Sequence, residues 1–288
     1  MLITLFQQLV NGLMSGTLYA LMAVGLTMTF GIMNITNFAH GEFLMIGAFA
    51  TFALVQAGMP FVPAVLVGAL AAGLLGVIVE RLTFRYTLDE PINGLVVSLG
   101  LIAILQNGMA RVVGTESYNL APPFAGTVQI AGVVLAVQRV WTIGLGALVI
   151  FAVWLLLKKS SLGRSLRALA VDRTAASLMG VRTERMYSIA FGLGCGLAGA
   201  AGGLLAALFP VSPFMGAAPV AKGFIVIVLG GLGSVPGAIA GGLLLGVVEA
   251  LGAGYISSAF RDGFGFVILI LVLLIRPKGL FGVLERRA

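Results

Sequence analysis

Long apolar segments, separated by short polar links, fill almost all of this chain. Hydrophobic residues make up 60% of the 288 positions and charged residues only 9%, whereas a soluble domain carries roughly 25% charged residues. Each helix that crosses a bilayer needs about 20 residues, so the apolar segments use the length that a separate soluble domain would require. The sequence therefore predicts an all-α, polytopic membrane helical bundle, formed as one transmembrane domain over residues 1–288.

Eight apolar segments are candidates for spanning helices. They cover residues 5–31, 38–58, 61–81, 91–111, 139–157, 187–208, 223–250 and 263–276. The seventh is too long for one simple crossing and contains helix-breaking residues, so eight or nine crossings are expected. The residues of this break are Gly230, Gly233, Ser234, Pro236 and Gly237. A broken helix can expose backbone groups to a cavity, as in transporters.

Glycines cluster within the predicted spans. They include Gly12 with Gly16, Gly242 with Gly246, and the run from Gly192 to Gly203. Small residues at such spacings let helix backbones approach closely in lipid, so tight helix packing is the leading interpretation. Cys195 is the only cysteine, which excludes an intrachain disulfide, and we expect it to pack as a small apolar residue.

The basic residues predict the orientation of the chain. The net charge is +7, and because Lys and Arg between spans hold short loops in the cytoplasm, we expect loop 158–187 and the C-terminus to be cytoplasmic. If the seventh segment crosses twice, basic residues on the same face include Arg81, Arg85, Arg276, Lys278, Arg286 and Arg287. Arg111, Arg139, Lys222 and Arg261 then fall on the other face. There, residues 112–138 predict an irregular or hairpin-like external loop, and no nucleic-acid partner is expected.

The sequence offers little for catalysis. His40 is the only histidine, so no histidine-rich metal site can form, and no G-x-S-x-G nucleophile motif occurs. The chain also contains no Gly-Lys dipeptide, which excludes a P-loop of the form G-x-x-x-x-G-K-[ST]. We therefore expect a non-catalytic chain without a metal or cofactor of its own, and any ATP hydrolysis must occur on another subunit.

A polar knot, defined as the segment from Asn34 to Glu42, lies between the first two apolar segments. It contains Asn34, Asn37, His40 and Glu42. Polar groups at membrane depth are costly and tend to face a cavity or a partner. Three interpretations stay open: an asparagine that caps the second helix, a lining of the translocation route, or a contact with a partner subunit.

Other polar residues lie within the apolar segments. The fourth segment holds Asn93, Ser98, Gln106 and Asn107. These side chains could form hydrogen bonds between helices or face a pathway, and the first is favoured. Glu249 is expected near the external interface, since Tyr255 follows it and aromatic residues favour that level.

The polar segment 160–180 interrupts the apolar pattern most strongly. Its spacing predicts two short helices, with Leu166 and Leu169 on one face, Asp172 as the cap of the second helix and Gly180 as its stop. The apolar pair at 178–179 has no obvious place in the membrane. Docking into a groove of another protein, simple topology anchoring and binding of lipid headgroups all remain open.

The chain resembles the LivH-type permease subunits of branched-chain amino acid ABC importers. Four motifs carry the resemblance over nearly the whole chain: NITNFAHGEF at 34–43, GRSLRALAVDRTAASLMGV at 163–181, GGLGSVPGA at 230–238 and RPKGLFG at 276–282. The resemblance implies a bacterial inner-membrane subunit that acts with a second, LivM-like permease. It also implies two cytoplasmic P-loop ATPase subunits that bind ATP and Mg, and a periplasmic substrate-binding protein.

The resemblance further implies that segment 160–180 contains the coupling helix, which docks on an ATPase. Coupling is carried over onto Arg164, Arg167, Asp172, Ala175, Ala176 and Gly180. The translocation route is assigned to Asn34, Asn37, His40 and Glu42. Related permeases carry urea, short amides or other amino acids, so these remain alternative substrates. An ion-coupled secondary transporter and a membrane enzyme are the rival functions.

Overall fold

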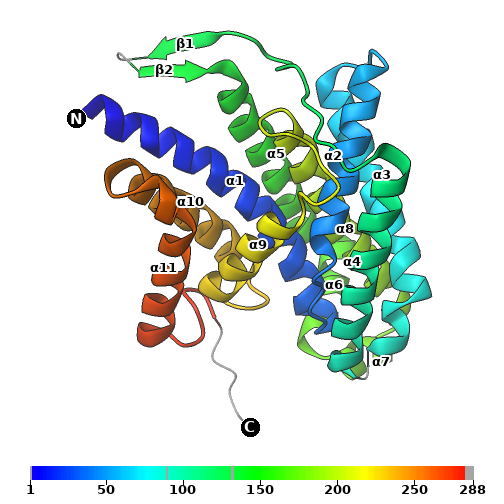
Figure 1. The fold of residues 1–288 in the computed structure, drawn as a ribbon. Coiled ribbons are helices and arrows are strands. Elements are labelled where there is room, and N and C mark those ends of the chain that lie inside the picture. Colours follow the sequence, from blue (N-terminus) through cyan, green and yellow to red (C-terminus); the bar gives the residue numbers. More distant parts are fainter. Residues whose placement is uncertain (1, 89, 131–132, 283–288) are drawn as a thin grey trace.

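The computed structural model is a bundle of apolar helices, and it describes residues 2–88, 90–130 and 133–282 (Figure 1). The long helices are α1 (Leu2–Met33), α2 (His40–Gln56), α3 (Phe61–Leu82), α4 (Pro91–Val113), α5 (Val137–Lys159), α8 (Thr183–Ala206), α10 (Val235–Tyr255) and α11 (Arg261–Ile275). Shorter elements are η1 (Phe84–Thr87), β1 (Thr127–Ile130), β2 (Val133–Ala136), α6 (Ser161–Val171), α7 (Arg173–Leu178), α9 (Ala217–Gly230) and η2 (Ser258–Phe260). The predicted all-α membrane architecture is confirmed.

The helices follow the predicted apolar segments closely. Seven of them, counted within the described residues, are long and apolar enough to cross a bilayer. Helix α2 has 17 residues and occupies the second predicted segment. The seventh segment is split into α9, with 14 residues, and α10, with 21. The predicted break is therefore present, and α9 begins at residue 217, six positions before the predicted start of that segment.

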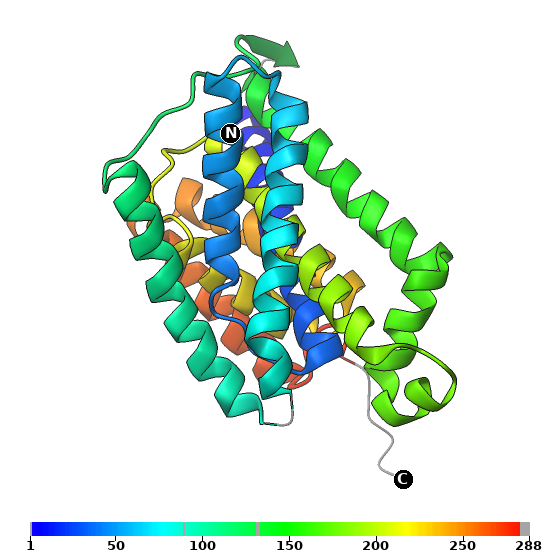
Figure 2. The same cartoon turned by 90° about the vertical axis from the view of Figure 1, so that its right-hand side faces the viewer.

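The two ends of the bundle differ in charge and structure. Strands β1 and β2 pair antiparallel at one end, which confirms the predicted hairpin. Figures 1 and 2 place α6, α7 and residues 276–282 at the opposite end. Arg81 and Arg85 line one pocket there together with Arg182 and Arg185. We call these the hairpin end and the basic end; Arg286 and Arg287 lie outside the described residues.

Glycines bring α1 and α10 into backbone contact. A Cβ placed on Gly16 would lie 2.9 Å from Leu243 Cα and 3.0 Å from Gly242 O. A Cβ on Gly12 would lie 2.7 Å from Val247 Cα. Such distances leave no room for any side chain, so the two helices can cross here only because these positions are glycines.

Helix α8 forms the centre of the bundle and packs in the same way. A Cβ on Gly194 would lie 2.7 Å from Gly25 O of α1, and one on Gly73 of α3 would lie 3.0 Å from Gly192 O. Cys195 is fully buried between these helices, as predicted for a small apolar residue. The glycine clusters therefore serve close packing.

We predict that Gly16→Ala destabilises the protein by about 1–3 kcal/mol, because the added methyl group must push α1 and α10 apart. Thermal unfolding in detergent measures the effect. Gly100→Ala is the matched control, since a Cβ at that position meets no atom within 4 Å and alanine favours a helix over glycine. Equal unfolding temperatures for the two variants would contradict the packing account.

Candidate functional sites

The segment between α5 and α8 folds as two capped helices at the basic end. The side chain of Ser160 accepts a hydrogen bond of 2.9 Å from the Gly163 amide and so caps α6. Helix α6 buries Leu166 and Leu169, as their spacing predicts. Arg164 and Arg167 stay on its exposed side, and the Arg167 guanidinium donates to the carbonyl of Leu157.

Helix α7 begins and ends as the sequence predicts. The Asp172 carboxylate accepts hydrogen bonds from the amides of Thr174 and Ala175, at 2.7 and 2.9 Å. Gly180 has a φ of +84°, a conformation that costs other residues energy, and the next amide donates back to Ala176 at 3.1 Å. Six residues alone make a marginal helix, so these caps fix the shape of α7.

Apolar side chains project from this segment into the surroundings. Leu178 is 82% exposed, Met179 85% and Val171 88%. Ala175 is also exposed, whereas Ala176 is buried against the rest of the chain. Ala176 therefore does not lie on the exposed face of α7, because its methyl group packs against the rest of the chain, and the exposed apolar residues of this segment are Val171, Leu178 and Met179. Its assignment to coupling stays a prediction.

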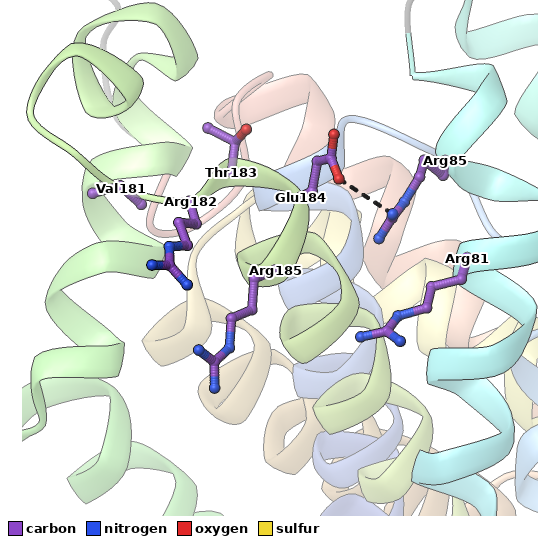
Figure 3. Close-up of a pocket in the computed structure, with 7 residues that line it drawn as sticks. All are labelled: Arg81, Arg85, Val181, Arg182, Thr183, Glu184 and Arg185. Carbon is purple, nitrogen blue, oxygen red and sulfur yellow. Dashed lines mark hydrogen bonds and ion pairs between the residues drawn. The ribbon is translucent and has the colours of Figure 1, made fainter.

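A pocket of about 590 Å³ lies next to α7 at the basic end (Figure 3). Arg81 and Arg85 reach it from the α3 side, and residues 181–185 at the start of α8 face them. Arg85 pairs with Glu184 at 3.3 Å and with the buried Glu80 at 3.5 Å. Four arginines and one carboxylate line the pocket, so its charged lining is predominantly positive.

The polar knot is buried, and the capping interpretation of it is wrong. Helix α2 starts after Ala39, which occupies the N-cap position and has no side-chain acceptor, so neither Asn34 nor Asn37 caps the helix. Asn34 has a φ of +55°. Asn34 is exposed, whereas Asn37, His40 and Glu42 are almost completely buried.

Few hydrogen bonds satisfy the knot. Gln106 of α4 donates to Glu42 at 2.9 Å, which confirms the interhelical role for this residue. Both side-chain polar atoms of Asn37 and both ring nitrogens of His40 lack a partner among the described residues. Buried polar groups without partners reduce stability. The unpaired groups of the knot, at the start of α2, therefore lower the stability of the fold.

Residues 93, 98 and 107 of α4 behave differently from Gln106. Asn93 donates to Glu90 at 2.9 Å, Ser98 to the carbonyl of Leu95 at 2.7 Å, and Asn107 to the carbonyl of Ala103 at 2.7 Å. All three bonds stay within the same short stretch of chain. The predicted interhelical role therefore holds for Gln106 alone among these four.

The helix break is closed by the C-terminal segment. Gly231 and Gly233 have φ values of +103° and +80°, and the Ser234 hydroxyl caps α10 by accepting from the Gly237 amide at 3.1 Å. The amides of Leu280 and Phe281 donate to the carbonyls of Leu229 and Gly230, each at 2.9 Å. The backbone groups at the end of α9 are thus satisfied by the tail, and the expectation that they face a cavity is wrong for these two carbonyls.

A cluster of charged residues, which we call the ion cluster, joins α1, α9, α10 and α11. Lys222 contacts Glu249, which is fully buried, and lies 3.0 Å from Asp262. Arg261 lies 3.7 Å from Glu249, and the Tyr19 hydroxyl donates to Glu249 at 2.9 Å. Two cations and two carboxylates therefore balance each other within this part of the bundle.

This ion cluster was not predicted from the sequence. Lys222 and Arg261 were interpreted only as topology signals, and Glu249 was expected near the external membrane interface. A lysine and a glutamate inside otherwise apolar segments usually pair with other charged residues and mark a functional site. The sequence therefore indicated that Lys222 and Glu249 need partners, although it did not show which residues these partners are.

A cavity of about 310 Å³ opens beside the ion cluster. Lys222, Arg261 and Asp262 line one part of it, and most of the remaining lining comes from apolar residues of α1, α2, α8 and α9. None of the predicted pathway residues lines this cavity.

We predict that Asp172→Ala loosens α7 by about 1 kcal/mol, because the cap is lost. Asp172→Asn keeps an acceptor oxygen and should retain most of the helix. Limited proteolysis within 172–182 in detergent measures the difference. Equal cleavage rates for the two variants would show that α7 does not depend on this cap.

We predict that Glu249→Gln destabilises the protein by about 3–5 kcal/mol, because it leaves Lys222 without its buried carboxylate. The double variant Lys222→Met with Glu249→Gln should recover much of this loss, since the unbalanced buried charge is gone. Thermal unfolding in detergent compares the three proteins. A single variant as stable as the unmodified chain would contradict the pairing.

The chain matches known permeases along almost its full length. The family described as "Branched-chain amino acid transport system / permease component" matches residues 8–275. The chain is 35% identical to the high-affinity branched-chain amino acid transport system permease protein LivH of Escherichia coli (strain K12), over 96% of this chain and 95% of that protein.

Other relatives agree with this result. The chain is 37% identical to the high-affinity branched-chain amino acid transport system permease protein BraD of Pseudomonas aeruginosa, over the same shares. It is 29% identical to a probable branched-chain amino acid transport permease protein LivH of Methanocaldococcus jannaschii, over 92% of this chain and 89% of that protein. No solved structure matches the chain. The chain therefore belongs to the family of permease components of branched-chain amino acid transport systems.

Proposed function

We propose that this chain is the membrane-spanning permease subunit of an ATP-driven importer for branched-chain or related aliphatic amino acids. The family match over residues 8–275 is the observation that carries the proposal. In this proposal the chain works in the bacterial inner membrane with a second permease subunit and a periplasmic substrate-binding protein. Hydrolysis of ATP, with its Mg, takes place on two separate ATPase subunits.

The basic end is cytoplasmic in this proposal. It carries the arginines of the pocket beside α7, and cytoplasmic loops carry the excess of Lys and Arg. The hairpin end then faces the periplasm and meets the substrate-binding protein.

Helix α7 is the docking element for one ATPase. Three features support this role: its two caps fix its shape, Leu178 and Met179 are exposed at its end, and it leads directly into α8 at the centre of the bundle. An apolar helix end suits a groove of another protein. Closure of the ATPases on ATP would move α7 and favour one of two arrangements of the permease pair.

The polar knot is proposed to take part in the movement that opens the route. Its partnerless groups on Asn37 and His40 are costly in the arrangement described. A shift of α2 against α1 and α8 could give them partners, which would help to balance two states.

One observation favours a second candidate function, an ion-coupled carrier. Such carriers hold acids within their spans, and Glu249 is a fully buried acid. Its two cationic neighbours argue for a permanent pair. Uptake that stops when the proton or sodium gradient is collapsed at constant ATP would support the carrier.

We predict that Leu178→Asp abolishes ATPase association and uptake together, because it places a charge in the apolar docking contact. Tyr86→Asp is the control: Tyr86 is 79% exposed at the same end but belongs to η1. Co-purification of ATPase subunits and leucine uptake in proteoliposomes measure both effects. Normal ATPase association of the Leu178 variant would refute the docking role of α7.

A further inference from the structure

We propose that the cavity beside the ion cluster is a binding site for the zwitterionic aliphatic amino acid on its way through the permease. In this site Lys222 and Arg261 hold the carboxylate, Asp262 holds the ammonium group, and the apolar wall holds the side chain. The inference rests on the proposed transport function and names the place where substrate is held.

The size and walls of the cavity fit such a ligand. Its volume of about 310 Å³ lies at the lower end of the range for small-molecule sites. Leu18 and Met22 of α1, Leu44 of α2 and Leu205 of α8 form an apolar wall. Binding sites of this kind combine an apolar lining with a few polar groups at one side. An aliphatic side chain gains from burial against this wall.

The charged side chains that line the cavity differ in their exposed fraction. The Lys222 side chain is only 10% exposed, Arg261 is 41% exposed and Asp262 is 82% exposed. Lys222 and Arg261 both line the cavity, whereas Glu249 lies behind them and does not. The two cations are therefore placed for a ligand carboxylate, and the more exposed Asp262 is placed for a ligand ammonium group.

The start of α9 adds to the positive character of this side. Helix α9 begins at Ala217, and Ala218 and Pro219 of its first turn line the cavity. The N-terminus of a helix carries partial positive charge, and half-helix N-termini in transporters point at anionic groups of the substrate. Lys222, one turn further along α9, lines the same cavity.

The balance of charges suits a zwitterion better than an ion. The ion cluster is already neutral, with two cations and two carboxylates. A zwitterion adds no net charge, so each of its ends can exchange partners with the cluster without leaving an unbalanced buried charge. Four members of the cluster line the cavity, namely Tyr19, Lys222, Arg261 and Asp262, so its polar groups are within reach of a bound ligand.

Cysteine labelling tests the site directly. Ala218 lines the cavity and its neighbour Ala217 does not, although both are exposed. Ala218→Cys and Ala217→Cys are made in a Cys195→Ala background and assembled with the other importer subunits in proteoliposomes. The rate of reaction with N-ethylmaleimide is then measured with and without L-leucine and the binding protein.

We expect leucine to slow labelling severalfold at position 218 and to leave position 217 unchanged. Labelling at 218 that leucine does not alter, in an importer that transports leucine, would overturn the inference. Unmodified importer that takes up no aliphatic amino acid would overturn the proposed function itself. Met215→Cys, a second lining position, replaces Ala218→Cys if the latter does not assemble.

Filling the cavity gives an independent measurement. Ala218→Leu should lower the maximal rate of leucine uptake about tenfold or more, because added methylene groups compete for the space of the substrate side chain. Alanine uptake should fall less, and Ala217→Leu should match the unmodified importer. Equal rates for the two variants, with normal assembly, would contradict the site.

Discussion

Helices α1 and α10 touch backbone to backbone at their glycines, and α8 does the same against α1 and α3. Lipid supplies no hydrophobic force between helices, so this contact must come from packing. This close approach of the helices also determines where the buried His40 side chain fits. A Cβ on Gly25 would lie 2.6 Å from Gly194 O and 2.7 Å from His40 Nε2. The buried histidine therefore fits only because two glycines let three helices meet.

Helix α9 is held by different contacts at its two ends. At the basic end the tail donates two amide hydrogen bonds to the last carbonyls of α9. Towards the other end Lys222 ties α9 to Glu249 of α10 and to Asp262 of α11. Lys222 thus joins α9 to α10 and α11 near one end of α9, and the segment after α11 binds the other end of α9.

Local signals in the sequence were enough to predict the capped helix and the break. Asp172 and Gly180 act through bonds to residues a few positions away, and such bonds follow from residue type and spacing. The ion cluster could not be predicted in this way, since Tyr19 reaches Glu249 across 230 positions. The burial of Ala176 could not be predicted, because only the packed fold decides which side of a six-residue helix is covered.

Purification of the tagged chain from its native membrane in mild detergent, followed by mass spectrometry, tests the central claim most directly. We expect recovery of a second hydrophobic permease together with P-loop ATPase subunits. Recovery of the chain alone in several mild detergents, still competent for uptake after reconstitution, would contradict it and identify a self-sufficient carrier.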